Sequence, residues 1–197
     1  NTDFYYSDSE ISGYFRARSG GSLILQDTFS LGTDLYSYDK NGVGLEGYHT
    51  VNGTEYYFIS GKKATDTAFR DESGSYYAAD ESGKLYALSN NTWTKAGNYY
   101  DYVKDGVIQK NTIAFIQGKY YGFDSYGRMY ANQTFSSGFE NSDLEENFRG
   151  SKGYVPKLWD YQTCHASASG ALLCNQWYED TTGKYYFDGN GIGYEGT

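Results

Sequence analysis

Proline, cysteine and basic residues are scarce in this chain of 197 residues, and each shortage excludes something. A single proline argues against disordered proline-rich linkers. The net charge of −9 disfavours binding to nucleic acid or anionic lipid through a basic surface. No apolar run approaches the roughly 20 residues of a membrane helix, so we expect no membrane insertion. Residues 1–10 are polar and show no signal peptide, which leaves open a signal that is removed.

The two cysteines, Cys164 and Cys174, leave two alternatives open. In an exported protein they can form a disulfide that closes a short loop and adds about 2–3 kcal/mol of stability. In a reducing compartment they remain thiols. Their spacing is not C-x-x-C and only His165 is nearby, so we expect no zinc site.

Tyrosine and glycine are abundant instead. Of the 39% of residues that are hydrophobic, aromatic residues account for 19 percentage points, and the chain has 24 tyrosines and 25 glycines. Typical cores are rich in Leu, Val and Ile, so this balance is unusual. Tyrosine and threonine favour strands, and glycine favours turns. The composition therefore predicts an all-β protein.

An aromatic segment recurs along the chain, each time as a short strand followed by a turn that ends in glycine. The clearest copies are LYSYDKNG (35–42), YYAADESG (76–83), YYDYVKDG (99–106), YYGFDSYG (120–127) and KYYFDGNG (184–191). The closing glycines belong to a series with a period of about 21 residues: Gly21, Gly42, Gly61, Gly83, Gly106, Gly127, Gly150, Gly170 and Gly191. Such a period predicts a repeat array or solenoid rather than a conventional core.

A second aromatic position follows each closing glycine from Gly21 to Gly170. It is occupied by Phe29, Tyr48, Phe69, Trp93, Phe115, Phe135, Trp159 and Trp177, which include all three tryptophans. A hairpin of about 20 residues is not stable alone, whereas stacked hairpins bury a continuous aromatic layer. In residues 119–135 we expect YYGFD to be one strand, DSYG the turn and RMYANQTF the return strand.

These units resemble the cell-wall-binding, or glucan-binding, repeats of Gram-positive surface proteins, which include choline-binding modules. GKYYGFDSYGRMYANQTF (118–135) and GKYYFDGNGIG (183–193) carry the resemblance best. It implies a β-hairpin solenoid on an exported protein that binds glucan, teichoic-acid choline or another surface carbohydrate, usually without catalysis. The Gly-Trp position of the family is mostly Phe or Tyr here. At most one choline cage is therefore expected, at Trp159 and Trp177 with Tyr185.

The repeat pattern weakens in the middle of the second half of the chain. We predict aromatic hairpin repeats over 1–135, an irregular Cys- and Trp-containing insertion over 136–182, and a final repeat over 183–197. SDLEENF (142–148) is compatible with a short helix. Degenerate repeats with long loops are the alternative.

Carbohydrate ligands stack on flat rings while polar groups bond their hydroxyls. Two stretches supply both kinds of group, KLWDYQTC (157–164) and NQWYED (175–180). The candidate ligand residues are Lys157, Trp159, Asp160, Tyr161, Gln176, Trp177, Tyr178, Tyr185 and Trp93. The alternative is that the tryptophans pack mainly in the core.

Catalysis is not indicated. Glycoside hydrolysis needs two carboxylates in a cleft, and acidic residues are too common here to single out a pair. The Asp-x-x-Gly turns lack the later ligands of a calcium loop. We expect no enzyme activity, metal or cofactor. The predicted function is an extracellular bacterial module, within a larger surface protein, that binds polysaccharide, preferably α-glucan. Anchoring to teichoic-acid choline or peptidoglycan, or a role as a structural or protein-interaction spacer, remain alternatives.

Overall fold

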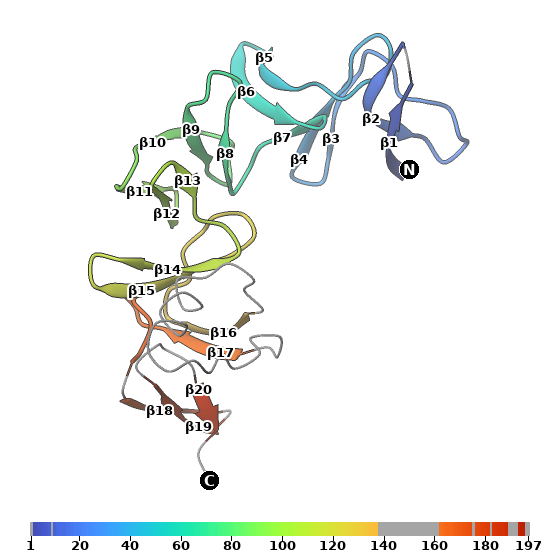
Figure 1. Ribbon diagram of the computed structural model, residues 1–197. Helices are drawn as coiled ribbons and strands as arrows, with labels where there is room; N and C mark the ends of the chain where they lie inside the picture. Colours follow the sequence, from blue (N-terminus) through green and yellow to red (C-terminus); the bar gives the residue numbers. More distant parts are fainter. Residues whose placement is uncertain are drawn as a thin grey trace. The chain divides into compact units, whose positions relative to one another are not determined.

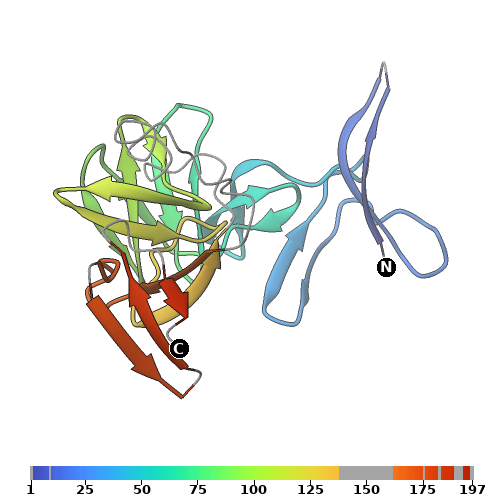
Figure 2. The ribbon, with the colours of Figure 1, turned by 60° about the horizontal axis from the view of Figure 1, so that its bottom comes forward.

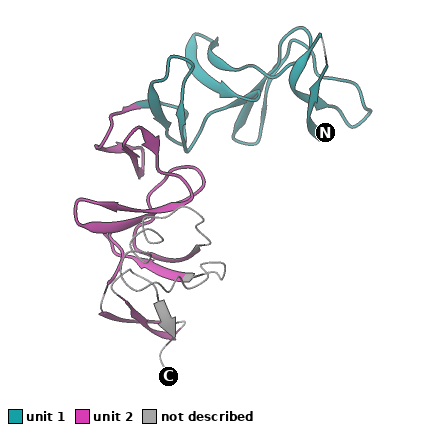
Figure 3. Ribbon diagram, viewed as in Figure 1, with its two compact units in different colours: residues 1–86 teal, residues 87–197 magenta. Residues whose placement is uncertain are grey.

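The computed structural model describes residues 2–8, 10–137, 162–174, 176–181, 183–188 and 193–195. The chain divides into two compact units, residues 1–86 and 87–197, which have separate colours in Figure 3. Within the described residues the regular elements are all β-strands, paired antiparallel in small sheets (Figure 1). The predicted all-β hairpin-repeat fold is confirmed.

Unit 1 contains three of these sheets. Their strands are β1 (Thr2–Ser7) and β2 (Ser12–Ala17); β3 (Thr28–Leu31), β4 (Asp34–Ser37), β5 (Gly47–Val51), β6 (Thr54–Ile59) and β7 (Lys62–Lys63); and β8 (Thr67–Arg70), β9 (Tyr76–Ala79) and β10 (Leu85–Leu88). The middle sheet has the order β3-β4-β7-β6-β5. The division between the units falls within β10.

Unit 2 also contains three sheets. Their strands are β11 (Trp93–Ala96), β12 (Tyr99–Lys104) and β13 (Val107–Ile108); β14 (Thr112–Ile116) and β15 (Lys119–Phe123); and β16 (Gln133–Ser137), β17 (Gln162–Ala166), β18 (Gln176–Asp180), β19 (Gly183–Phe187) and β20 (Gly193–Glu195). The last sheet has the order β16-β17-β20-β19-β18. Figure 2 shows the paired strands from a second side.

At six of its described positions the recurring aromatic residue lies in the first strand of a hairpin and pairs with an aromatic residue in the second, whereas Phe135 in β16 pairs with Cys164 in β17. These cross-strand pairs are Phe29–Tyr36, Tyr48–Tyr57, Phe69–Tyr77, Trp93–Tyr102, Phe115–Tyr120 and Trp177–Tyr186. Aromatic side chains directly opposite each other stabilise an antiparallel pair. In these hairpins the recurring aromatic residue therefore marks the first strand, and the aromatic segment before the closing glycine forms the second.

This pairing corrects the strand assignment expected for residues 119–135. The main partner of β15 is the preceding strand β14. The segment after the DSYG turn forms a single bridge to β15, Phe123 to Met129, and its end belongs to β16, which pairs with β17. The hairpin tip is Gln117–Gly118, where both residues have positive φ, as a type I′ turn requires. This turn type matches the twist of the two strands, so the hairpin closes before the Asp-x-x-Gly turn and not at that turn, where the sequence predicts it.

The Asp-x-x-Gly turns share one hydrogen-bonding pattern. In the turn that begins at Asp124, carboxylate Oδ1 accepts from the backbone N–H groups of Tyr126 and Arg128. The turns at Asp39 and Asp80 repeat this arrangement two and four residues on. The described closing glycines, Gly21, Gly42, Gly61, Gly83, Gly106, Gly127 and Gly170, all have φ between 79° and 97°. The repeat therefore depends on a backbone conformation that glycine adopts at little cost.

The segment after such a turn bonds to an earlier hairpin. Met129 N–H donates to Tyr100 O at 2.8 Å, and Leu172 N–H donates to Tyr120 O at 2.8 Å. In unit 1, Gly44 N–H donates to Tyr14 O at 2.7 Å. Each unit is thus held together by main-chain bonds from one repeat to another.

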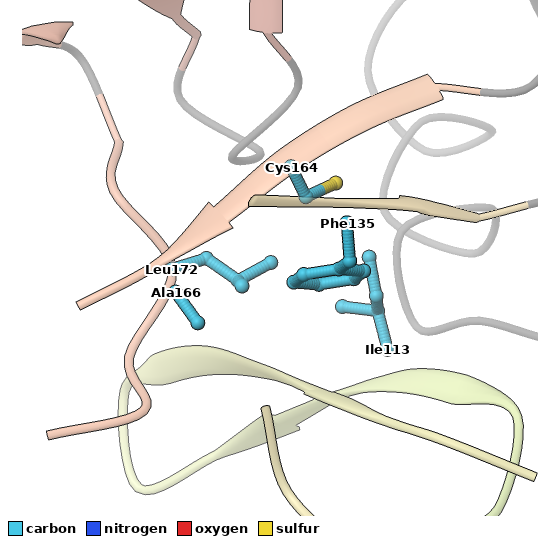
Figure 4. Close-up of a cluster of buried hydrophobic side chains, with 5 residues drawn as sticks. All are labelled: Ile113, Phe135, Cys164, Ala166 and Leu172. Carbon is cyan, nitrogen blue, oxygen red and sulfur yellow. The ribbon is translucent and has the colours of Figure 1, made fainter. Parts of the chain in front are cut away.

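Aromatic and small side chains fill the space between hairpins. One buried cluster in unit 1 contains Tyr57, Ala64, Phe69 and Ala79. One cluster in unit 2 contains Tyr102, Ala114, Ile116, Phe123 and Met129, and another contains Ile113, Phe135, Cys164, Ala166 and Leu172. Figure 4 shows the ring of Phe135 beside Ile113 and Leu172. The core is thus a series of thin layers, as the repeat pattern indicates.

The insertion predicted for 136–182 remains a prediction. Residues 138–161, including the predicted short helix, lie outside the described residues. Within the described part of this segment, β17 pairs with β16, and β18 pairs with β19.

Candidate ligand-binding site

Trp93 lies at the start of β11, where its indole contacts the aromatic core of unit 2. The ring centroids of Tyr102 and Tyr121 are each 4.8 Å away, and Phe123 stacks at 5.9 Å with an interplanar angle of 17°. Tyr102 belongs to the same hairpin as Trp93, whereas Tyr121 and Phe123 belong to the next one. Trp93 is only half-buried, so part of the indole stays accessible while the rest is held by the core.

A cavity of about 670 Å³ opens beside Trp93. Its walls come from β11, β12, β15 and the start of β16 and from the segments that follow β11, β15 and β17, all of them in unit 2. The lining residues are Trp93, Asn98, Tyr99, Tyr100, Tyr121, Met129, Ala131, Gln133, Ala168 and Ser169. Ligand pockets in proteins commonly have volumes of about 300–1,000 Å³, so this cavity can hold a small ligand or part of a polymer.

The Tyr99–Tyr100 doublet supplies accessible aromatic surface, since the two residues are 40% and 41% exposed. The ring of Tyr99 is held from one side by Arg128, whose guanidinium carbon is 4.7 Å from the ring centroid. Arg128 is itself fixed by Asp124, with 2.7 Å between Arg128 Nε and Asp124 Oδ2. A wall that is fixed before binding lowers the entropic cost of holding a ligand.

The polar groups of the cavity are uncharged. Asn98, Gln133 and Ser169 are exposed and offer amide and hydroxyl groups that both donate and accept hydrogen bonds. Charged groups border the aromatic wall, since Lys95 Nζ lies 5.8 Å from the ring centroid of Tyr100 and Arg128 lies beside Tyr99. In β12 the Asp101 carboxyl is 2% exposed, and burial, reinforced by the charge of Asp124, raises its pKa to about 7. The cavity can thus stack a ring or apolar face and bond its polar edge.

Trp177, which the sequence analysis selected, lies in a different setting. It is in β18 and is 59% exposed, so it is not a core residue. Its ring contacts Tyr186 at 5.3 Å, and Lys184 Nζ lies 5.1 Å from the ring centroid. The Trp177 face therefore already has a cation beside it.

The other candidates in this hairpin are on the opposite face. Successive residues of a strand point to opposite sides of a sheet, so Gln176 and Tyr178 face away from Trp177. Tyr178 packs against His165, with ring centroids 3.9 Å apart, and pairs across the hairpin with Tyr185. The structure thus places the candidates of this hairpin on two faces. Lys157, Trp159, Asp160 and Tyr161 lie outside the described residues.

The structure holds Cys164 and Cys174 as thiols, and their pairing in a disulfide stays a prediction. Both belong to one apolar environment, since Cys164 is part of a buried cluster and Cys174 packs against it. Cys174 Sγ contacts Leu172 O at 3.6 Å, and burial raises the pKa of its thiol. Burial in an apolar layer favours the neutral thiol over the thiolate, the form that reacts to make a disulfide.

Trp93 is predicted from the sequence as a ligand residue, but the residues that complete its cavity are not. Tyr99, Tyr100, Tyr121 and Met129 all belong to repeat motifs that looked structural. The available indication was the Tyr-Tyr doublet, since adjacent strand residues cannot both face the core.

In the part of the chain that the structure describes, no helix has the length and apolar character needed to cross a membrane. Among the same residues, no three His, Cys, Asp or Glu side chains are grouped in a way that could hold a metal ion.

No protein-family model matches the chain, and no curated protein matches it. Among solved structures, it is similar to the modular autolysin LytC of Streptococcus pneumoniae, with a TM-score of 0.38 and 18% identity over 96% of this chain and 37% of that one. For choline binding protein F of the same organism the TM-score is 0.37, with 18% identity over 96% of this chain and 66% of that one. For the choline-binding domain of CbpL from Streptococcus pneumoniae the TM-score is 0.36, with 17% identity over 98% of this chain and 87% of that one.

The chain spans 37% of the length of the LytC structure and 48% of the length of CbpF in its complex with ipratropium. Because the TM-scores lie below 0.5, we base the function on the chain's own residues. The solved structures to which the chain is similar include choline-binding repeat proteins of Streptococcus pneumoniae.

Proposed function

We propose that the chain is a non-catalytic binding module for a glycopolymer of the bacterial cell surface, and that the Trp93 cavity is its ligand site. The observation that carries the proposal is the open aromatic cavity that two successive hairpins form around Trp93 and Tyr121. A site built from two repeats is held in place by the same core that stabilises the fold. We place the module outside the cell, within a longer surface protein.

A sugar ring fits the chemistry of this cavity. Its C–H face stacks on flat rings such as Trp93 and Tyr100, and its hydroxyls bond groups such as Gln133. The volume of about 670 Å³ exceeds what a lone ammonium head group fills, so a chain of sugars uses it better. Within this class the α-glucan preference rests only on the resemblance of the repeat motifs, and the similar solved structures that are choline-binding proteins favour choline or peptidoglycan of the cell wall.

A specific observation favours a second ligand, the choline group of teichoic acid. The rings of Trp93 and Tyr121 meet at 64° and come from successive hairpins, beside the apolar Met129. Aromatic faces that surround a quaternary ammonium attract it by cation–π interaction, each such contact contributing about 0.5–2 kcal/mol. Choline would then occupy part of the cavity, with the attached polymer in the remainder.

Affinity electrophoresis against a polymer panel tests the proposal. The gels contain amylopectin, dextran, pullulan or purified choline-containing cell wall, with and without free choline. The test variant is Tyr100→Ala, because Tyr100 lines the cavity and is 41% exposed, so we expect the fold to tolerate its loss. The matched control is Tyr5→Ala, since Tyr5 is another exposed strand tyrosine, at 59%, and lies in unit 1.

We expect retardation by at least one polymer, reduced in Tyr100→Ala and unchanged in Tyr5→Ala. Removal of one stacking ring should weaken binding about fivefold to tenfold, which corresponds to roughly 1–1.4 kcal/mol. If free choline abolishes the retardation, the ligand is the choline group. If the retardation persists in free choline, the ligand is the sugar. Equal retardation of Tyr100→Ala and the wild type would refute this site, and no retardation in any gel would refute the function.

A further inference from the structure

A second cavity, of about 420 Å³, is formed by residues of unit 1 alone. It lies between the hairpin of β5 and β6 and the turn that joins β8 to β9, all labelled in Figure 1. The side chains that define it are Glu46, Tyr48, His49, Tyr57, Asp71 and Glu72. Its chemistry differs from that of the Trp93 cavity, because three of these side chains are carboxylates.

Two tyrosines form the aromatic wall of this second cavity. Tyr48 is 41% exposed, and its ring meets that of Tyr57 edge to face, with centroids 5.0 Å apart and an angle of 82°. Tyr57 is 7% exposed and stacks on Phe69 at 4.2 Å, so it is part of the core. The accessible ring of Tyr48 therefore rests on a fixed support.

The carboxylates are held around this wall by main-chain and side-chain contacts. Tyr48 Oη donates to Asp71 Oδ2 at 3.2 Å, while Asp71 Oδ1 accepts from Ser75 N–H. Glu46 Oε1 accepts from Ser60 N–H at 2.6 Å. Glu72 Oε1 lies over the start of β5, only 3.3 Å from where a Cβ on Gly47 would stand.

The carboxylates of the second cavity act electrostatically on its tyrosines. Burial raises the pKa of the Tyr57 hydroxyl, and the charges of Glu72, Asp71 and Glu46 raise it further, because all three oppose a phenolate. Burial and hydrogen bonds to Tyr77 and Asp71 also raise the pKa of Tyr48. Both phenols stay protonated at neutral pH. An organic cation in the cavity therefore meets neutral ring faces and negative carboxylates.

We propose that this second cavity binds a primary ammonium group, as carried by an amino sugar without an N-acetyl group or by an amino-acid ester. The ring of Tyr48 attracts the cation, and the carboxylates of Asp71 and Glu72 accept its N–H donors. A quaternary ammonium has no N–H to donate, so it keeps the ring contact and the Coulomb attraction of the carboxylates but loses their hydrogen bonds. The inference adds a site and a ligand class to the proposed function and is independent of the Trp93 cavity.

Amide NMR titration of the whole chain tests the inference. The probes are glucosamine and D-alanine methyl ester, with N-acetylglucosamine as the neutral analogue and choline as the cation without N–H groups. The test variant is Glu72→Gln, which keeps the shape and removes one charge. The chain offers a closely matched control in Glu81→Gln, because Glu72 and Glu81 both occupy the second position of an exposed DESG turn.

We expect glucosamine and the ester to shift the amides of residues 46–49 and 71–73, and N-acetylglucosamine and choline to bind at least fivefold more weakly. Glu72→Gln should weaken ammonium binding about fivefold, and added salt should do the same, whereas Glu81→Gln should have no effect. If only one of the two amines binds, it identifies the source of the ammonium group.

Three outcomes would overturn the inference. They are equal affinity of Glu72→Gln and Glu81→Gln, choline binding as tight as glucosamine binding, and no shift at residues 46–49 and 71–73 with either amine. Shifts confined to the lining of the Trp93 cavity would overturn it while leaving the proposed function in place. Loss of polymer binding in Tyr100→Ala, in turn, says nothing about the ammonium site, so the two claims fail separately.

Discussion

The carboxyl of Asp101 gives the fold of unit 2 a pH dependence that one substitution can isolate. Asp101 is 2% exposed, and its pKa is raised from an ordinary value of 3.8 to about 7. Burial is the main cause, Asp124 adds to it, and Lys110 and Arg128 oppose it. The perturbation is Asp101→Asn, which keeps the size of the side chain and removes its titration.

The sign follows from the direction of this pKa. Between about pH 4 and pH 7 the folded chain holds a proton on Asp101 that the unfolded chain has released, so the free energy of unfolding decreases as pH rises through this window. The full stabilising effect is present below the unfolded pKa and is lost above pH 7. Each pKa unit corresponds to about 1.36 kcal/mol, so the wild type should lose roughly 4 kcal/mol relative to Asp101→Asn between pH 4 and pH 8.

Urea unfolding followed by circular dichroism and tryptophan fluorescence, at pH values from 4 to 8, measures this difference. His165 contributes the opposite slope, because burial lowers its pKa and stability is lost as pH falls through the ordinary histidine range. That contribution is present in both proteins and cancels in the comparison. Glu179→Gln, an exposed charge removal in unit 2, is the control. Parallel pH profiles for Asp101→Asn and the wild type would refute the reasoning.

Two further predictions concern the backbone and the thiols. Gly44→Ala should lower the free energy of unfolding by about 1–3 kcal/mol, because a Cβ there would lie 2.7 Å from the backbone of Gly61. Urea unfolding measures the loss, and an unchanged urea midpoint would contradict the close approach of the two backbones. Cys164 and Cys174 should react with iodoacetamide at pH 8 slowly in the folded chain and completely in urea without reductant, as mass spectrometry can show; failure to label in urea would instead reveal a disulfide.

The repeat could be predicted from the sequence because its chemistry is local. A turn that requires positive φ selects glycine, so Gly42, Gly83 and Gly127 mark the period directly. The aromatic positions mark it again, because a residue such as Phe69 must pair across its hairpin with Tyr77.

Strand partners and the site were harder to predict. The Tyr-Tyr strand β15 has a turn on each side. Because Gln117–Gly118 is a weaker turn sequence than Asn-Gly, the sequence predicts the hairpin tip at the DSYG turn after the strand, whereas it lies before the strand. Trp93 and Trp177 occupy the same repeat position, yet their surroundings differ. The next hairpin packs Tyr121 against Trp93, whereas Lys184 of its own hairpin lies beside Trp177. Such contacts between repeats are not encoded in the local motif.

The proposed function has its most direct test in the three tryptophan indole N–H resonances of the ¹⁵N-labelled chain. Each is first assigned by a single substitution of Trp93, Trp159 or Trp177 with phenylalanine. The polymer fragment or choline that binds in the gels is then titrated into the wild type. Our account predicts that the Trp93 indole shifts saturably, with the same midpoint as the amides around the cavity. A shift of Trp159 or Trp177 with Trp93 unmoved would contradict it and place the ligand elsewhere.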